Sequence, residues 1–361
     1  MFGHNHYVPI LRWKRAERIA LRQLRDGDRR VITPLMELVP GNFGPNSKDL
    51  VPAPQNVLAK VATQVGKDWG ASSIFVDLWL LSPMPRLPDG VHPLAFLAAE
   101  VRSLGLAMIP VTGLSRDAAY QRAVGTIALV DRRGVCLRIH PTEMSSPDFV
   151  TRVDRLLSDL GVRKDQVDFC LDCQDHIHAP AGLSNLESVI PTLNMWRTFI
   201  VASGAFPPDL QGFSIGQHLL PRADWLTWRR HVGARPRAAR LPAYADYTIQ
   251  CGHFAEPPER ANFSASIRYA APEDWVIMRG EGVFHDGSPG FSQWPANAQM
   301  LCGRPEFCGP NFSEGDRYIY EMAHQSVRTG GAETWLRAGI NHHLTLVARQ
   351  LASLPDCATD P

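Results

Sequence analysis

The chain has 361 residues, of which 45% are hydrophobic and 20% are charged, and its formal net charge is +1 at pH 7. This composition is typical of a globular protein with one large domain or two small ones, and so small a net charge excludes a global field that would select nucleic acid or a membrane surface. The seven cysteines are scattered, no apolar signal segment opens the chain, and no apolar run approaches the ~20 residues of a spanning helix. We therefore expect a cytoplasmic protein with reduced thiols.

Strand-like and helix-like segments alternate over the first 250 residues. Short apolar runs bounded by turn residues predict strands, and apolar residues at helical spacing predict the helices between them. The expected strands are 7–12, 31–38, 73–81, 106–111, 134–140, 167–173, 196–205 and the segment ADYTI at 245–249. The expected helices are 15–24, 55–65, 94–103, 117–124, 146–160, 186–195 and 225–232.

This alternation predicts an α/β fold, a TIM-like (β/α)8 barrel. Strands and helices that alternate at a spacing of roughly 25–40 residues indicate a parallel sheet with crossover helices, and eight such units fit a closed barrel. A doubly wound open sheet is the alternative, but no glycine-rich phosphate turn follows the first strand. We expect residues 1–259 to form the barrel and residues 260–361 to form a C-terminal elaboration packed on the barrel mouth, within one continuous domain. The elaboration contains a hairpin at 267–279 and a helix at 332–353.

Ionisable or polar residues recur where the expected strands end. In chain order they are Lys14, Glu37, Asp77, Thr112, Arg138 with His140, Asp172, Ser203, and Asp246 with Tyr247. In a barrel the carboxyl ends of the strands build the active site, so these side chains are expected to gather at one mouth. A charge beside a buried strand is costly unless it is paired or used. The pattern therefore indicates either a functional pocket or salt bridges that close the barrel.

The functional interpretation gives these residues roles. The candidate catalytic residues are Asp172 and Asp246 as general bases or metal ligands, Glu37 and Asp77 in support, and His343 as an acid. The candidate anion-binding residues are Lys14, Arg138, Arg268 and Arg279. The carboxylates suit Mg²⁺ or Mn²⁺, but they could equally form a self-neutralising network with arginine and no metal. His176 and His178 are an incomplete metal-ligand pair.

Several segments together resemble a known family. They read YVPILRWKRAERIAL, ITPLMEL, CLRIH, ADYTI, SIRYAAPEDWVIMRG, FSEGD and WLRAGINHH, and they occur in this order along nearly the whole chain. In this order they resemble the phage T4 beta protein family, and the opening is more loosely similar to the sce7725 group of barrel-like proteins. The resemblance implies a phage-linked, defence-associated role and one continuous domain. It supplies no catalytic residues.

Two functions follow as hypotheses. The first is a hydrolase or phosphodiesterase-like enzyme that acts on a phosphate-bearing, nucleotide-like ligand at the barrel mouth. The second is a non-catalytic sensor or partner-binding subunit of a phage defence or counter-defence system, with a protein partner encoded in the same operon. The arginines between 229 and 240 form a modest basic cluster, so contact with nucleic acid remains open.

Overall fold

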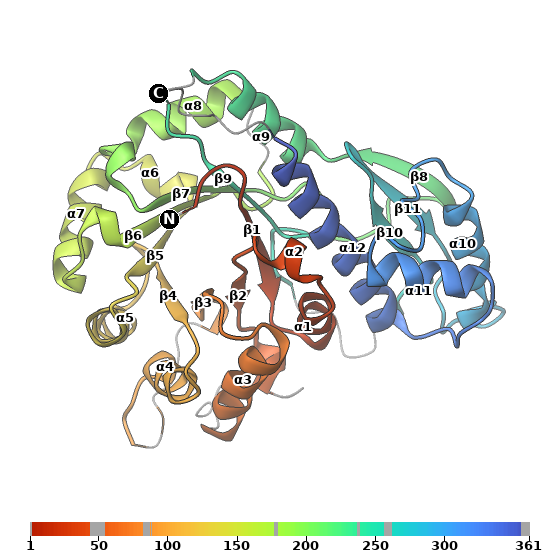
Figure 1. The fold of residues 1–361 in the computed structure, drawn as a ribbon, viewed down its shortest axis with the longest axis horizontal. Coiled ribbons are helices and arrows are strands. Elements are labelled where there is room, and N and C mark those ends of the chain that lie inside the picture. Colours follow the sequence, from red (N-terminus) through yellow and green to blue (C-terminus); the bar gives the residue numbers. More distant parts are fainter. Residues whose placement is uncertain are drawn as a thin grey trace.

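The first two thirds of the chain close into a barrel of parallel strands (Figure 1). The computed structural model describes residues 2–43, 55–81, 87, 89–176, 180–236, 239–255 and 262–354. The barrel strands, in spatial order, are β1 (Tyr7–Arg12), β2 (Leu35–Glu37), β3 (Ile74–Asp77), β4 (Met108–Thr112), β5 (Val135–Ile139), β6 (Val167–Asp172), β7 (Thr198–Ala202) and β9 (Ala243–Asp246). Each strand pairs in parallel with its neighbours, and β9 closes the ring on β1. The predicted (β/α)8 architecture is confirmed.

Helices connect these strands around the outside of the barrel. They are α1 (Arg15–Arg22), α2 (Asp26–Arg29), α3 (Gln55–Asp68), α4 (Pro93–Ser103), α5 (Ala118–Asp131), α6 (Pro141–Met144), α7 (Phe149–Leu160), α8 (Pro180–Val189) and α9 (Ala223–Gly233). Short 3-10 turns are η1 (Pro40–Phe43), η2 (Trp79–Leu81), η3 (Lys164–Gln166) and η4 (Leu193–Met195). Helix α7 shows why these segments are helical, because Phe149, Val153, Leu157 and Leu160 recur at helical spacing and bury one face. It ends at Gly161, whose φ of 68° is the left-handed conformation that glycine adopts without strain.

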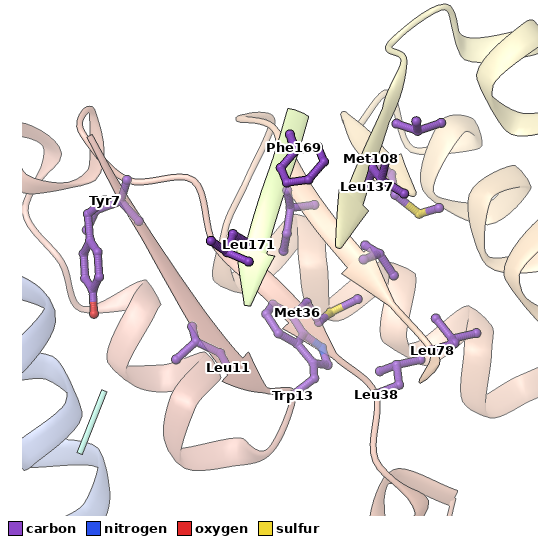
Figure 2. Packing of buried hydrophobic residues seen from close by; sticks show 14 of the residues in the cluster. Tyr7, Leu11, Trp13, Met36, Leu38, Leu78, Met108, Leu137, Phe169 and Leu171 are labelled. Carbon is purple, nitrogen blue, oxygen red and sulfur yellow. The ribbon is translucent and has the colours of Figure 1, made fainter. Parts of the chain in front are cut away.

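Strand alternation divides the apolar residues into two layers. Inward positions such as Val8, Ile10 and Cys170 fill the barrel lumen. Outward positions form a larger core against the helices, and Figure 2 shows members of this outer layer, among them Leu11 and Leu171. The side chains that reach the barrel mouth are therefore those at the carboxyl ends of the strands that point inward, like the lumen residues two positions before them.

A small antiparallel sheet stands beside the barrel (Figure 1). Its order is β10 (Ile267–Ala270), β11 (Asp274–Arg279) and β8 (Gly216–Pro221). The hairpin expected at 267–279 is present as β10 and β11. Helices α10 (Gln293–Cys302) and α11 (Glu314–Ala323), preceded by the turn η5 (Gly290–Ser292), cover this sheet and share a second apolar core with it.

Two features differ from the expected division at residue 259. Strand β8 lies inside the range expected to be barrel, yet it pairs with β11 of the small sheet. Helix α12 (Ala332–Ala352) packs against α1 and β10 along the side of the barrel, where it follows β9 as the last helix of the ring (Figure 1). Its central residues 338–348 are buried all round, as expected for a helix enclosed between two layers. Within the described residues, no helix is both long and apolar enough to cross a membrane.

Candidate functional site

At the carboxyl ends of six of the eight barrel strands, the last inward position carries a charged or hydroxyl side chain. These residues, all buried, are Arg12, Glu37, Asp77, Arg138, Asp172 and Tyr247. The first five end or nearly end a strand, and Tyr247 directly follows β9. They continue the parity of the apolar lumen residues, so alternation brings them to one mouth.

Arg138 lies at the centre of this cluster. Its Nη1 donates to Glu37 Oε1 at 2.7 Å and to Asp77 Oδ2 at 3.0 Å, while its Nε donates to Asp172 Oδ2 at 2.8 Å. Its Nη2 donates to the Tyr247 hydroxyl at 2.9 Å. Burial alone would lower the pKa of Arg138, but the surrounding acidic groups, Asp172 first, raise it well above its usual value. The guanidinium is therefore a permanent cation, and its hydrogen-bond partners surround the planar group.

Glu37 joins this centre to two further side chains. Arg12 Nε lies 3.5 Å from Glu37 Oε2, and Arg12 Nη2 donates to the carbonyl of Gly252 at 3.0 Å. The indole Nε1 of Trp79 donates to Glu37 Oε1 at 2.9 Å. The Trp79 ring also faces the guanidinium of Arg138, whose central carbon lies 5.4 Å from the ring centroid.

Arg116, from the loop after β4, extends the cluster outward. Its Nη2 donates to both carboxylate oxygens of Asp77, at 3.2 and 3.1 Å. Its guanidinium lies over the rings of Trp79 and Tyr120, at 5.6 and 5.7 Å from their centroids. Three arginines thus face three carboxylates, so the charges at the mouth are balanced.

Asp172 and Tyr247 form a short hydrogen-bonded pair. The tyrosine hydroxyl lies 2.8 Å from each Asp172 oxygen, and the backbone N–H of Gln174 donates to Oδ1 at 2.9 Å. Burial, and then the nearby Asp172 charge, raises the pKa of Tyr247 well above its usual value. Tyr247 therefore remains a protonated donor, and the lone pairs of Asp172 are taken up by three neighbours.

A cavity of about 280 Å³ opens beside this network. Its lining consists of Trp79, Ser115, Arg116, Arg138, His140, Glu143, Asp172, Gln174 and His253. These residues come from the carboxyl ends of β3, β5 and β6 and from the loops after β4 and β9. The cavity combines cations, carboxylates and imidazoles, which is the mixture that a polar ligand site needs.

Among the described residues of the lining, three buried polar atoms lack a hydrogen-bond partner, namely Arg116 Nε, His140 Nε2 and Glu143 Oε1. His140 is the N-cap of α6, and its Nδ1 accepts from the backbone N–H of Thr142 at 3.4 Å. With Nδ1 as the acceptor, the neutral ring carries its proton on Nε2. The other oxygen of Glu143 accepts from the His140 backbone N–H at 2.9 Å. The cavity wall thus holds two unused N–H donors and one unused carboxylate oxygen.

The structure brings Glu37, Asp77, Arg138 and Asp172 together at one mouth, but not Asp246. Asp246 Oδ1 accepts from the Tyr7 hydroxyl at 2.5 Å, and Oδ2 lies 2.8 Å from His343 Nε2 on α12. The expectation that Asp246 and His343 face the cavity is wrong, because Asp246 has the outward parity of β9, opposite to Ala245 and Tyr247. Burial would raise the pKa of Asp246, but His343 lowers it. The pair is a buried link between barrel and helix.

Arg268 and Arg279 lie on the small sheet and not at the mouth. Arg268 Nη1 donates to the carbonyl of Ile249 at 3.1 Å, and its guanidinium lies 4.7 Å from the ring centroid of Phe206. Burial, followed by the charge of Arg279, lowers the pKa of Arg268 to about 10. Arg279 donates to the carbonyl of Leu210 at 3.1 Å. Both arginines join the small sheet to loops that leave the barrel.

The carboxylates at the mouth do not have the arrangement of a metal site. Among the described residues, no group of three or more His, Cys, Asp and Glu side chains could hold a metal ion. Glu37, Asp77 and Asp172 point instead at the Arg138 guanidinium, which supplies the central positive charge itself. The donor set therefore does not fit Mg²⁺ or Mn²⁺. His178 lies outside the described residues.

The basic cluster between residues 229 and 240 is neutralised in part. Arg229 pairs with Glu273 at 2.6 Å, and Arg235 pairs with Glu187 at 2.8 Å. Arg237 lies outside the described residues. Paired arginines of this kind offer little free charge to a nucleic acid.

Sequence reasoning missed several residues of the site. Arg12 carried a usable signal, because it continues the inward alternation of Val8 and Ile10. Trp79 begins the 3-10 turn η2 and does not lie at the end of the strand expected at 73–81, and Arg116 and His253 stand on loops, where no periodicity shows which way a side chain points. Their contribution depends on loop conformation and could not be read from the chain.

The closed parallel barrel and the charged cavity at its carboxyl-end mouth define the class of the molecule, a TIM-like barrel protein with a polar mouth site. The family model named Beta protein matches residues 7–349, so the chain belongs to the Beta protein family. The match runs through both the barrel and the small sheet. A comparison with curated proteins found no match.

Proposed function

We propose that the barrel mouth binds a phosphate-bearing ligand and hydrolyses it. The observation that carries this proposal is the set of unpartnered atoms on one cavity wall, Arg116 Nε, His140 Nε2 and Glu143 Oε1. A buried donor or acceptor without a partner costs about 1–3 kcal/mol, and a ligand that supplies the partners recovers this energy. Two N–H donors in the lining of one cavity suit the oxygens of a phosphoryl group.

The roles follow from which lone pairs and protons are unused. Arg116 and His140 donate to phosphoryl oxygens, and Glu143 Oε1 takes the proton of the attacking water. The water oxygen bonds to phosphorus, the bond from phosphorus to the leaving oxygen breaks, and the leaving oxygen takes a proton from solvent. Asp172 is less suited to be the base, because its oxygens already accept from Arg138, Tyr247 and Gln174. In this proposal Asp172 positions Arg138.

A second candidate function is binding without catalysis. It is favoured by the mutual neutralisation of Glu37, Asp77 and Asp172 with arginine, which leaves Glu143 as the one cavity carboxylate with an unused oxygen among the described residues. A sensor only has to bind its ligand, and a network of balanced charges gives the cavity a rigid, preorganised lining. In either case we propose a role linked to phage defence or counter-defence, an expectation that comes from the resemblance of the sequence segments to the phage T4 beta protein family, with a protein partner from the same operon as a further prediction.

One experiment separates the two functions. Purified protein is incubated with nucleotides, phosphodiesters and oligonucleotides, with and without Mg²⁺, Mn²⁺ or Zn²⁺, and binding is measured by calorimetry. An enzyme turns over at least one compound, Glu143→Gln keeps binding but loses turnover, and Arg116→Gln weakens binding. Arg122→Gln, an exposed arginine on α5, is the matched control and changes neither.

A non-catalytic sensor gives binding that depends on Arg116 and no turnover in any variant. Absence of binding to every phosphate-bearing compound, or binding that Arg116→Gln leaves unchanged, would contradict both functions. Plating efficiency of phage on cells with and without the chain tests the defence role separately.

A further inference from the structure

We propose a second anion site, specific for a phosphate group, in a basic cavity next to the mouth. This cavity has a volume of about 240 Å³ and lies between α1, η1 and α3. The side chains that matter for the argument are Trp13, Lys14, Arg15, Arg18, Lys60 and Gln64. Four of the described lining residues are basic, and no acidic residue is among the described residues that line it.

The positive charge of this cavity is only weakly compensated. Arg15 pairs with Glu333 at 3.2 Å, but the two side chains are 68% and 45% exposed, and pairs of this kind contribute little. Arg18 lies 3.6 Å from Asp68, which also pairs with Arg22. Burial, opposed in part by Asp68, lowers the pKa of Arg18, and the neighbouring Arg15 and Arg22 lower it further. A bound anion would relieve this crowding of like charges.

The two lysines of the cavity have no ion pair within the described part of the chain. Lys14 Nζ lies 5.4 Å from the ring centroid of Phe254, and Lys60 is an exposed residue of α3. Lysine is a compact donor that suits phosphate oxygens. Both side chains are therefore available to a ligand in the cavity.

A buried donor without a partner independently points to a ligand. Trp13 is among the residues that line the cavity, it is 1% exposed, and its indole N–H has no acceptor. Helix α1 also begins here, and its N-cap Lys14 makes no side-chain hydrogen bond to the first turn. The first N–H groups of a helix have no intrahelical partner and attract anions. Glu17 of this turn is buried, does not line the cavity and accepts from Gln250.

The cavity is a neighbour of the mouth but a separate site. The Phe254 ring is close to both Lys14 and Arg12, at 5.4 and 5.7 Å from their charged groups, and Arg12 belongs to the mouth network. Among the described residues, the lining of the basic cavity shares no residue with that of the mouth cavity. The proposal therefore does not depend on whether the mouth is catalytic. The ligand chemistry is a phosphate group, either free or as a phosphate ester.

The test is calorimetric titration with inorganic phosphate and, separately, with adenosine monophosphate, at constant ionic strength in chloride. We expect saturable binding by the native chain and a loss of about tenfold or more in affinity in the double variant Lys14→Gln with Lys60→Gln, because two charged donors are removed. Trp13→Phe keeps the ring but removes the N–H, and should weaken binding several-fold. Lys67→Gln, an exposed lysine on the same helix as Lys60, is the matched control and should bind as the native chain does.

The two ligands identify the source of the phosphate, because a preference for inorganic phosphate indicates a free anion and a preference for the monophosphate indicates an ester. Arg116→Gln, which alters the mouth alone, should leave this site intact. The proposal is overturned if no saturable binding occurs, if the lysine double variant binds like the control, or if Arg116→Gln abolishes all phosphate binding. Thermal unfolding of every variant establishes that a lost signal is not a lost fold.

Discussion

Replacing Arg138 by methionine tests the energetics of the barrel mouth. The change removes the guanidinium from between Glu37, Asp77 and Asp172, whose oxygens lie 2.7–3.0 Å from it. Each hydrogen bond to a charged group is worth about 1.5–3 kcal/mol, so the contacts of Arg138 set a ceiling of roughly 6–12 kcal/mol. Measured losses on breaking one side of a buried ion pair are nearer to 3–5 kcal/mol. We expect a loss of about 4 kcal/mol in the free energy of unfolding.

Urea unfolding followed by circular dichroism measures this loss, and a double variant isolates its cause. Arg138→Met leaves buried carboxylates that face one another. Asp172→Asn should therefore lower the free energy of unfolding less in the Arg138→Met variant than in the native chain. Arg122→Met, at an exposed site on α5, is the control and should change the free energy of unfolding by less than about 0.5 kcal/mol. A loss below about 1 kcal/mol for Arg138→Met would refute the reasoning, because it would mean that the network behaves as a solvated surface cluster.

Two further predictions concern carboxylates away from the mouth. Burial, and then the charge of Asp246, raises the pKa of Asp224 from 3.8 to about 6. Between these two pH values the folded chain therefore holds more protons than the unfolded chain. The free energy of unfolding falls as the pH rises through this range, by about 3 kcal/mol in total. Asp224→Asn should remove this part of the pH dependence in urea unfolding between pH 4 and 6; parallel curves for the two proteins would exclude the assignment. Asp246→Asn removes the charge that faces His343 and should lower stability by about 2–3 kcal/mol while phosphate-ligand binding at the mouth is retained. Normal stability together with lost binding would instead place Asp246 in the site.

The barrel could be predicted because its signals are local and repeated. Each strand is a short apolar run followed by a helix, and all eight barrel strands overlap the predicted segments, although β9 (Ala243–Asp246) begins two residues before the segment expected at 245–249. The inward direction of Arg138 and Asp172 was also predictable. Each is a charged residue within an apolar strand, and the alternation of that strand determines the side to which it points. The bond between them joins residues 34 positions apart, yet parity alone placed both at the same mouth.

What could not be predicted depends on contacts that the local pattern does not encode. In the segment at 243–247 small and large residues alternate up to the charge at the fourth position, so the outward direction of Asp246 became clear only from its contacts with Tyr7 and His343. Strand β8 has exposed and half-buried residues in alternation and gains its partner from β11, more than 50 positions downstream. The role of α12 was hidden because the small sheet separates it from β9 in the sequence.

The most direct test of the proposed mouth site is a crystal structure of the chain with a non-hydrolysable phosphodiester analogue. We predict a phosphoryl group in the mouth cavity within hydrogen-bonding distance of Arg116 Nε and His140 Nε2, with Glu143 Oε1 facing the position of an attacking water. A mouth cavity filled only by ordered solvent at saturating analogue, or an analogue bound away from Arg116 and His140, would contradict the account.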